Sequence, residues 1–336
     1  MLEVHSLNGC TILRLSKINV SVVIPVYNAA VYVSQAVESA LAQPETAEVL
    51  LVEDGSPDNA LEVCEDLANK HDKVKLLRHP NGENRGAGAS RNLGMRAAKK
   101  EYIAFLDADD YFLPGRFRQA LELFNANPDC EGVYEAVGML VDGSESLERW
   151  QLAGRRVKDL QTMSDSISPK DLAEVLIKGS DGYFHLDGLI IKKGVLQRSG
   201  LMNENLHLHQ DTEFIMRLAM TARLLPGKLD EPVAMWRVHQ ENRISAPRSL
   251  TMQYRDRMRY WRSLYQWVRQ NGSPKQQQRV RAGIFSYNRA TKFQTFSKRI
   301  LPIRVIIFGR QLRLLAWPQL IFDHLASKNN NEEGCL

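Results

Sequence analysis

YIAFLDADDYFLPGRF, residues 102–117, is the stretch of the chain that decides the fold. Its first five residues, Tyr102–Leu106, are apolar or aromatic and form a short run, which predicts a buried strand. Three acids, Asp107, Asp109 and Asp110, follow at the point where this strand ends. Ligands of an open parallel sheet bind beyond the carboxyl ends of its strands. The stretch therefore predicts both a sheet and a binding site at its edge.

The hundred residues before this stretch alternate between two hydrophobic periods. Short β-branched runs predict three further strands, and apolar residues at helical spacing predict the helices between them. The predicted strands are 20–26, 49–52 and 74–77, and the predicted helices are 32–42, 60–68 and 87–98. Strands that alternate with helices indicate an α/β fold, in which helices flank both faces of a mostly parallel sheet.

The pattern weakens after this part of the chain. Residues 130–168 predict short strands and polar loops, and helices are expected again over 169–178 and 210–222. Beyond Pro247 the chain predicts helical pieces rich in arginine and aromatic residues. We expect one domain over 1–245, made of halves 18–120 and 121–245, and a basic helical C-terminal region over 246–336.

The charge of the chain supports this division. The formal net charge is +5, but residues 248–328 contain 17 Lys and Arg against two acids, a local charge of +15. The rest of the chain therefore carries −10. An acidic body with a basic tail indicates two different tasks.

The composition excludes several classes of protein. With 336 residues, 44% of them apolar and 25% charged, the chain is ordinary globular material. No run approaches the roughly 20 apolar residues that a membrane-spanning helix needs, and the start of the chain lacks the pattern of a signal peptide. The four scattered cysteines predict no disulfide framework, so we expect a cytoplasmic protein.

Asp107 and Asp109 are candidate metal ligands. Residues i and i+2 of an extended segment point to one side, so both carboxylates can face one spot. Two such charges repel unless a cation neutralises them, and oxygen ligands suit Mg²⁺ or Mn²⁺, which proteins often bind together with substrate phosphates. The alternative is a solvated turn at the end of a strand.

Polar residues follow the other predicted strands as well, in the segments 25–28, 53–58 and 84–88. The Asp54 carboxylate is expected either to bind a base or ribose or simply to form a turn. Gly86 and Gly88 are expected to let the backbone and Arg91 approach a phosphate at a helix N-terminus. The third glycine of a dinucleotide-binding fingerprint is missing, which argues against a Rossmann cofactor site.

Several motifs in order resemble the nucleotide-binding half of family 2 glycosyltransferases. The resemblance covers residues 18–120 and continues more loosely to about residue 245. It is carried by VSVVIPVYNAAVYVSQAVESAL (20–41), LLVEDGSPD (50–58), NRGAGASRNLGM (84–95) and YIAFLDADDYFLPGRF (102–117). The resemblance implies the GT-A fold, transfer with inversion, and a UDP-sugar or similar donor.

The resemblance also assigns residues to the donor. Pro25, Tyr27 and Asp54 would hold the nucleoside, with Tyr27 against the base. Arg91 lies where such enzymes contact other groups of the donor. Asp107 and Asp109 match the D-x-D motif.

The metal site follows from the same motif. Asp109 would be the principal ligand of Mn²⁺ or Mg²⁺. His239, in Arg237-Val-His239, falls where related enzymes place a histidine that can join the metal. The alternative for His239 is a purely structural role.

Asp211 matches the catalytic base of the family. Inversion needs a carboxylate that takes the proton of the attacking hydroxyl. The family usually has Glu-Asp here, whereas this chain has Gln210-Asp211. The alternative is capping of the helix predicted to begin at residue 210. The segments 185–187 and 207–209 are expected near the acceptor pocket, and their histidines match no zinc-binding spacing.

The basic tail allows three interpretations. Arginines alternate with Tyr and Trp over 254–269, and residues 300–322 mix arginine with large apolar side chains. Such a segment can lie in an anionic membrane surface, bind single-stranded nucleic acid, or pack its apolar side on the catalytic domain. Nucleic acid is the weakest of the three, and membrane contact would suit a lipid-linked acceptor.

These observations predict an inverting, metal-dependent glycosyltransferase that uses a nucleotide sugar and a glycan or lipid-linked acceptor. It would act in cell-surface polysaccharide or glycolipid synthesis, in the cytoplasm or peripherally on the inner face of the membrane. The alternatives are a metal-dependent nucleotidyltransferase and a non-catalytic, nucleotide-binding protein at the membrane, for which Gln210 is the encouraging feature. The chain contains no P-loop, which argues against ATPase or kinase chemistry.

Overall fold

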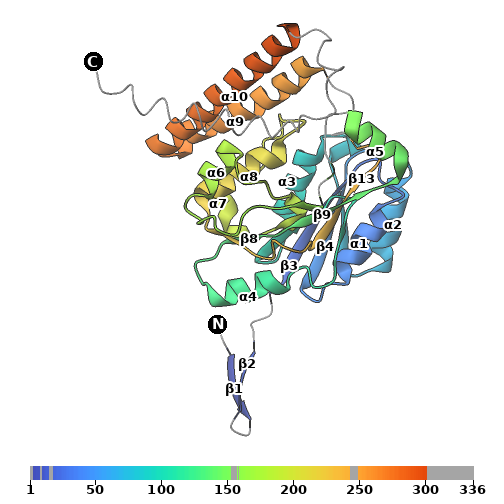
Figure 1. Ribbon diagram of the computed structural model, residues 1–336. Coiled ribbons are helices and arrows are strands. Elements are labelled where there is room, and N and C mark those ends of the chain that lie inside the picture. The colour runs from blue at the N-terminus through green and yellow to red at the C-terminus, as the bar shows by residue number, and fades with distance from the viewer. Residues whose placement is uncertain are drawn as a thin grey trace. The chain divides into compact units, whose positions relative to one another are not determined.

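The computed structural model (Figure 1) describes residues 3–7, 10–14, 18–152, 157, 159–242 and 249–300. The chain divides into two compact units, Met1–Arg281 and Ala282–Leu336. Helix α9 (Leu250–Asn271) lies in the first unit, whereas the sequence placed it in a separate basic region. Helix α10 (Pro274–Ile300) begins in the first unit and continues into the second. Strands β1 (Glu3–Leu7) and β2 (Cys10–Arg14) form an antiparallel pair.

A seven-stranded sheet forms the centre of the first unit, in the order β12-β8-β11-β6-β3-β4-β5. Strands β6, β3, β4 and β5 are parallel to one another, and β11 is antiparallel to both of its neighbours. The mostly parallel sheet is therefore confirmed. Its strands are β3 (Val20–Val26), β4 (Thr46–Glu53), β5 (Val74–Arg78), β6 (Tyr102–Phe105), β8 (Gly132–Tyr134), β11 (Leu189–Lys192) and β12 (Leu224–Pro226).

The helices predicted from apolar spacing are confirmed, with ends that differ by at most three residues. The sequence did not predict α4, α7 or α5, and α5 lies in a region where it predicted strands and loops. Its buried residues are Ser146 and Trp150, too few for an apolar period to be recognised. The helices are α1 (Val33–Leu41), α2 (Ala60–Lys70), α3 (Ala87–Ala97), α4 (Arg118–Ala126), α5 (Gly143–Leu152), α6 (Leu172–Lys178), α7 (Leu196–Ser199) and α8 (Gln210–Thr221), with single 3₁₀ turns η1 (Pro80–Gly82), η2 (Leu186–Gly188) and η3 (Lys193–Val195).

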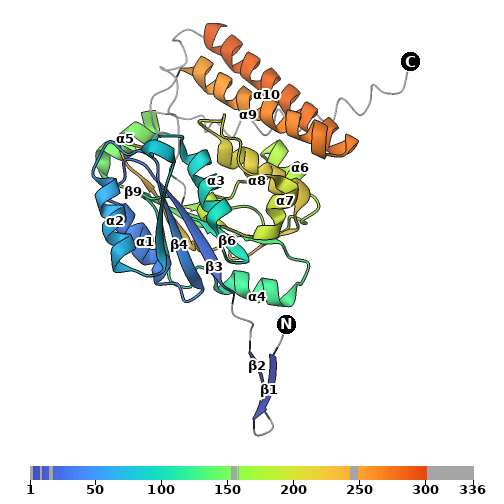
Figure 2. The same cartoon turned by 180° about the vertical axis from the view of Figure 1, so that it is seen from behind.

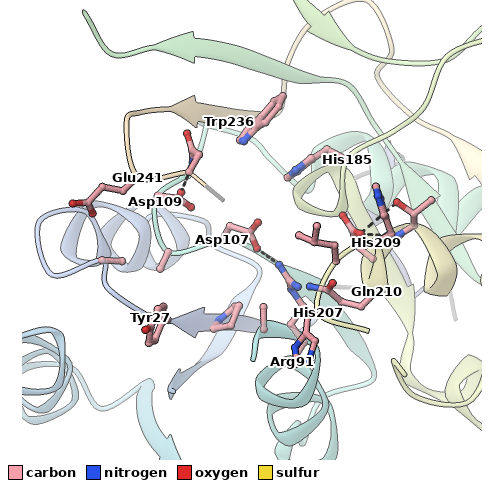
Figure 3. Close-up of a pocket in the computed structure, with 18 of the residues that line it drawn as sticks. Tyr27, Arg91, Asp107, Asp109, His185, His207, His209, Gln210, Trp236 and Glu241 are labelled. Atoms are coloured by element: carbon pink, nitrogen blue, oxygen red, sulfur yellow. Dashed lines mark hydrogen bonds and ion pairs between the residues drawn. The ribbon is translucent and has the colours of Figure 1, made fainter. Parts of the chain in front are cut away.

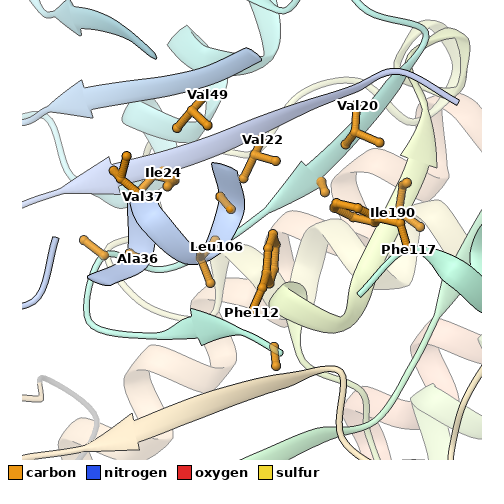
Figure 4. Packing of buried hydrophobic residues seen from close by; sticks show 14 of the residues in the cluster. Val20, Val22, Ile24, Ala36, Val37, Val49, Leu106, Phe112, Phe117 and Ile190 are labelled. Carbon is orange, nitrogen blue, oxygen red and sulfur yellow. The ribbon is translucent and has the colours of Figure 1, made fainter. Parts of the chain in front are cut away.

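Each face of the sheet carries its own hydrophobic core, because successive side chains of a strand point to opposite faces. Val22 and Ile24 of β3 pack against α1 and α2 on one face (Figure 4), and Val23 packs with residues of α3, α6 and α8 on the other. Figure 1 and Figure 2 show α1 and α3 on opposite sides of the sheet. Both faces are thus covered, as a buried parallel sheet requires.

Helix α3 lies unusually close to β3. A Cβ atom on Gly94 would come within 2.4 Å of the Cγ1 atom of Val23, so only glycine allows this approach. Arg91 is one turn before Gly94 and therefore lies on the same side of the helix. The close packing holds Arg91 at the carboxyl end of the sheet.

A second sheet, in the order β10-β9-β13-β7, lies next to the acidic stretch in the chain. Strand β7 begins at Tyr111, directly after the acids, and pairs with β13, which carries Trp236 and leads to His239. The pairing of β7 with β13 therefore brings the acidic stretch close to His239, which lies more than a hundred positions further along the chain. The strands are β7 (Tyr111–Phe112), β9 (Val137–Val141), β10 (Leu160–Gln161) and β13 (Ala234–Val238).

Helix α9 packs its apolar side on the protein. Met258, Trp261, Leu264 and Val268 are buried, and Ser263 accepts a hydrogen bond from Asn203 and donates one to Glu213. Of the three interpretations of the basic tail, packing on the rest of the protein is the one that α9 shows, and its arginines lie at the surface. The other stretch considered for membrane contact, 300–322, lies outside the described residues after Ile300. Among the helices that the structure describes, none has the length and apolarity to cross a bilayer.

A buried ion pair joins the two sheets. Arg116 and Glu135 are both 0% exposed, and Nη1 of Arg116 lies 2.5 Å from Oε2 of Glu135. The guanidinium also lies against the rings of Phe112 and Phe117, and its Nε donates to the carbonyl of Asp187 at 3.0 Å. The pair thus connects β8, the start of α4 and the turn η2.

We expect the substitution Arg116→Met to destabilise the protein by about 3–5 kcal/mol, because it leaves the Glu135 carboxylate buried without its partner. The free energy of unfolding in urea measures this loss. Arg118→Met is the matched control, since Arg118 is exposed, and should change it by less than about 0.5 kcal/mol. Equal unfolding midpoints for the two variants would contradict the prediction.

Candidate functional site

A cleft of about 780 Å³ opens at the carboxyl ends of β3, β4 and β6 (Figure 3). Its walls come from distant parts of the chain, including the segment after β3, the start of α3, the acidic loop and residues 207–212. Gly86 and Gly88 do not line it, whereas all eight residues to which the sequence assigned a donor-binding, metal-binding or catalytic role do: Pro25, Tyr27, Asp54, Arg91, Asp107, Asp109, Asp211 and His239. Their meeting in one place is a finding, whereas their individual roles stay predictions.

Tyr27 is the most exposed of these residues, with 40% of its surface accessible. It follows directly on β3, and the next residue, Asn28, has a positive φ of 52°. Asn28 donates from its side chain to Glu241 at 2.9 Å and from its backbone to Ser56 at 3.3 Å. An L-residue seldom adopts this conformation, and these two contacts hold it in place at the rim of the cleft.

Asp54 is almost fully buried and holds a neighbouring loop. Its carboxylate accepts hydrogen bonds from the backbone amides of Arg85 at 2.7 Å and Gly86 at 2.8 Å. Gly55 permits this approach, because its φ is +66° and a Cβ there would lie 2.6 Å from the Gly82 carbonyl oxygen. Asp54 thus shapes the start of α3 as well as lining the cleft.

Arg91 points a buried guanidinium into the cleft. One of its nitrogens donates to Asp107, while Nε and Nη1 are buried without a hydrogen-bond partner among the described residues. Burial disfavours its charge, but the carboxylates of Asp107, Asp211 and Asp187 outweigh this and raise the pKa of Arg91. Buried donors without partners are uncommon in folded proteins, and a ligand anion would satisfy these two.

Asp107 lies in the most acidic part of the cleft. Burial raises the pKa of its carboxyl group, Arg91 opposes that rise, and Asp187 adds to it. The backbone amide of Asp107 donates to Asp187 Oδ1 at 3.2 Å. The Asp187 side chain thus orients Asp107, the first acid of the D-x-D pair, through a hydrogen bond from the backbone of Asp107.

Asp109 and His239 form the pair that best fits a divalent ion. His239 Nε2 lies 2.9 Å from Asp109 Oδ2, and Asn242 Nδ2 donates to the same oxygen at 3.0 Å. Neighbouring ligands of an octahedral Mg²⁺ or Mn²⁺ lie about 3 Å apart, because each is ~2.1 Å from the ion. The carboxylate and imidazole are therefore spaced as two ligands of one ion would be.

A second set of possible ligand atoms, from Asp107, Asp110 and His185, lies within 4.8 Å among the described residues. Asp110 is 1% exposed and accepts a hydrogen bond from the Arg237 amide at 2.7 Å. Asp110 itself does not line the cleft, whereas Asp107 and His185 do. The described residues thus offer two candidate ligand sets beside the cleft, and the sequence predicts the one that contains Asp109 and His239.

Asp211 is the second residue of α8, and the residue before that helix is His209, whose φ is +61°. The capping alternative is therefore wrong in its simple form, because Asp211 is not the N-cap residue. Its Oδ1 accepts from the Thr212 amide at 2.7 Å, which satisfies one free donor of the first turn. The strained backbone at His209 sets the direction in which α8 begins.

Gln210, where the family usually has an acid, packs against α3. A Cβ on Gly88 would lie 3.3 Å from its Cγ atom, and its Oε1 is buried without a partner among the described residues. Gln210 thus fills the space between α3 and α8 without adding a charge beside Asp211.

His185 is half-buried at the wall of the cleft. Its Nδ1 lies 3.3 Å from Asp187 Oδ2. Burial lowers the pKa of this imidazole, but Asp187, Asp107 and Asp211 raise it to about 9 overall. His207 and His209 also line the cleft. These histidines thus line the cleft, and their position near an acceptor stays a prediction.

Sequence reasoning missed two further parts of the lining. Trp150 and Trp236 line the cleft, as does one side of α9 through Gln253, Asp256 and Arg257. The spacing 253, 256, 257 marks one face of a helix, but no sequence pattern shows what that face meets.

The chain resembles known families and proteins in its sequence. The model of the family described as "Glycosyl transferase family 2" matches residues 21–163. An uncharacterized glycosyltransferase of Haemophilus influenzae is 36% identical over 188 residues, which cover 53% of this chain and 74% of that protein. The succinoglycan biosynthesis protein ExoU of Rhizobium meliloti is 40% identical over 103 residues, 31% of this chain and 30% of ExoU. The chain spans about half the length, or less, of several other relatives that it matches.

Solved structures share the fold. TarS 1-349 of S. aureus in complex with UDP-GlcNAc superposes with a TM-score of 0.60 at 19% identity, covering 79% of this chain and 71% of that one. The mannosyltransferase PcManGT of Pyrobaculum calidifontis, in complex with GDP-Man and Mn²⁺, superposes with a TM-score of 0.51 at 15% identity, covering 84% of this chain and 80% of that one. At these identities the likeness establishes the fold, which is of the GT-A type.

We expect His185 to titrate near pH 9 in an NMR titration of its ring, against about 6.5 in the unfolded chain. Its contribution to stability is then fully present below pH 6.5 and is lost as the pH rises through 9. Asp187→Asn should lower the pKa of His185, because it removes the neighbouring negative charge. The control, Asp181→Asn, changes an exposed site and should leave the pKa of His185 unchanged. Spectra recorded with EDTA exclude metal effects. A ring that titrates at 6.5 in the wild type would refute the prediction.

Proposed function

Because the chain belongs to glycosyl transferase family 2, we propose that it is an inverting glycosyltransferase. It moves a sugar from a nucleoside diphosphate to an acceptor hydroxyl. The observation that carries the proposal is the meeting of Asp211, from the start of α8, with Tyr27, Arg91 and Asp109 in one cleft. An acceptor base and a donor site must lie together for direct transfer.

The donor is proposed to bind along the carboxyl ends of β3, β4 and β6. Tyr27 offers an exposed ring on which a base can stack, with Pro25 and Asp54 beside it. The Nε and Nη1 atoms of Arg91, which have no hydrogen-bond partner among the described residues, suit a phosphate oxygen. A UDP-linked sugar is favoured, because TarS, which shares the fold, is known in complex with UDP-GlcNAc.

The proposed metal site consists of Asp109 and His239, supported by Asn242. Bound Mn²⁺ or Mg²⁺ would stabilise the negative charge that develops on the leaving diphosphate. The hydrogen bond from Asn242 orients the Asp109 carboxylate. PcManGT, with the same fold, is known with Mn²⁺, which supports this choice of ion.

Asp211 is proposed as the general base. The acceptor oxygen attacks the anomeric carbon from the side opposite the diphosphate and forms the new C–O bond. The bond between that carbon and the phosphate oxygen breaks, the nucleoside diphosphate leaves, and the acceptor proton passes to Asp211. The hydrogen bond from the Thr212 amide to Oδ1 holds the carboxylate in position for this transfer.

The proposed setting is the synthesis of a cell-surface polysaccharide or glycolipid, in the cytoplasm or on the inner face of the membrane. The name of ExoU, a succinoglycan biosynthesis protein, supports a polysaccharide. The exposed arginines of α9 support contact with an anionic surface. Arg255, Arg262 and Arg269 are seven residues apart and therefore lie on one stripe of the helix.

We expect Asp211→Asn to lower the rate of transfer by about a hundredfold or more, because it removes the base. Donor binding should persist, so a thermal shift with Mn²⁺ and the donor should remain. Asp109→Ala should lose both the transfer and the Mn²⁺-dependent part of that shift. A screen of UDP-, GDP- and CDP-linked sugars that detects the released nucleoside diphosphate provides the assay.

Asp66→Asn is the control, since Asp66 is exposed on α2, away from the cleft, and it should keep the wild-type rate. Full activity of Asp211→Asn would eliminate Asp211 as the base. Release of pyrophosphate in place of a nucleoside diphosphate would replace glycosyl transfer with nucleotidyl transfer.

For membrane contact, we expect the triple variant Arg255→Gln, Arg262→Gln, Arg269→Gln to bind phosphatidylglycerol vesicles at least tenfold more weakly, because each basic residue near an anionic surface contributes about 1 kcal/mol. Sedimentation with vesicles measures this. A control triple at exposed sites elsewhere, Lys70→Gln, Arg118→Gln and Lys170→Gln, makes the same change in charge. Equal weakening by both triples would show that total charge, and not α9, attracts the surface.

A further inference from the structure

One wall of the cleft is aromatic, and the proposed donor chemistry does not use it. This aromatic wall consists of Trp236 on β13, His185 before the turn η2, and Trp150 on α5. Figure 3 shows Trp236 and His185 together on one side of the cleft, apart from Tyr27. The wall therefore lies away from the place proposed for the base of the donor.

The two rings that face the cleft form a broad surface. The rings of His185 and Trp236 are nearly parallel, with 19° between their planes and 5.6 Å between their centroids. This separation is typical of offset rings, which overlap only in part. Each ring thus leaves part of a face uncovered, and both remain partly exposed.

The aromatic wall is held from behind. Trp150, which is 2% exposed, meets Trp236 edge-on with centroids 5.3 Å apart. His185 is fixed by its ion pair with Asp187, which is itself fully buried. A rigid aromatic surface loses little conformational entropy when a ligand binds to it.

Hydrogen-bonding groups surround the aromatic wall within the same cleft. Asp211, Thr212, His207 and Gln161 all line it. A flat apolar surface surrounded by polar groups suits a molecule with an apolar face and polar edges. A pyranose ring is such a molecule, since its C–H groups form faces and its hydroxyl groups lie around the edge.

We propose that the acceptor is itself a sugar, whose pyranose ring lies on Trp236 and His185 and presents a hydroxyl group to Asp211. This inference rests on the proposed function and narrows it. The acceptor would be the end of a glycan. A lipid alcohol would need a continuous apolar channel, whereas polar side chains line the cleft around the aromatic wall. Trp236 is then a specificity-determining residue for the acceptor.

The test measures binding of a probe panel by saturation-transfer NMR, in the presence of UDP and Mn²⁺. The panel consists of the methyl pyranosides of glucose, galactose, mannose and N-acetylglucosamine. At least one should bind the wild type, and Trp236→Ala should weaken that binding roughly tenfold, because the stacking surface is lost. Trp236→Phe, which keeps an aromatic face, should restore most of it.

Two controls separate this effect from damage to the fold. Trp267→Ala removes a tryptophan of α9 that does not line the cleft, and it should leave pyranoside binding unchanged. Hydrolysis of the donor sugar by water needs no acceptor, so Trp236→Ala should lower pyranoside binding at least about fivefold more than it lowers this hydrolysis. A substitution that only disturbed β13 would lower both readouts together.

Equal pyranoside affinity of Trp236→Ala and the wild type overturns the proposal. So does a panel in which no pyranoside binds to a wild-type protein that hydrolyses its donor; binding of octanol instead would then indicate a lipid alcohol. If no donor is bound or hydrolysed, the proposed function itself fails. The donor readout distinguishes that failure from the failure of the acceptor assignment.

Discussion

The structure depends on the balance of charge where β6 ends. Asp107, Asp109, Asp110 and Asp187 gather there, and like charges held this close destabilise the fold unless they are offset. Three of these carboxylates have a basic partner, because Asp107 meets Arg91, Asp109 meets His239 and Asp187 meets His185. Burial raises the pKa of Asp110 well above its ordinary value, and Asp187 and Asp109 add to the rise.

This balance prepares the cleft for charged ligands. Asp109 and His239 have the spacing of two metal ligands, and Arg91, whose Nε and Nη1 have no partner among the described residues, lines the same cleft. The ion and the phosphate of the proposed donor would then need little reorganisation of these groups, which is the condition under which fixed charges contribute most to catalysis. Two residues with positive φ, Asn28 and His209, border the same cleft. Strained backbone of this kind persists when surrounding contacts hold it.

The buried pair Arg116–Glu135 links this charged region to the core. The Arg116 Nε donates to the carbonyl of Asp187, whose carboxylate in turn accepts from the Asp107 amide. A chain of contacts therefore runs from the centre of the protein to the first acid of the D-x-D pair. The position of that acid is thus determined by packing as well as by its place after β6.

The sequence by itself determined the helices and strands of the first hundred residues and the eight residues that meet in the cleft. The helices and strands follow from apolar periodicity, and the residues of the first half follow from polar residues where parallel strands end, whereas Asp211 and His239 were identified through the resemblance to family 2 glycosyltransferases. Tertiary structure alone decided the aromatic wall, the ion pair of Arg116 with Glu135, and the face of α9 that lines the cleft. Trp150 on helix α5 and Trp236 on strand β13 lie 86 residues apart in the chain, so no local sequence pattern predicts their contact. Such contacts arise only when the strand pairing of β13 with β7 and β9 brings the segments together.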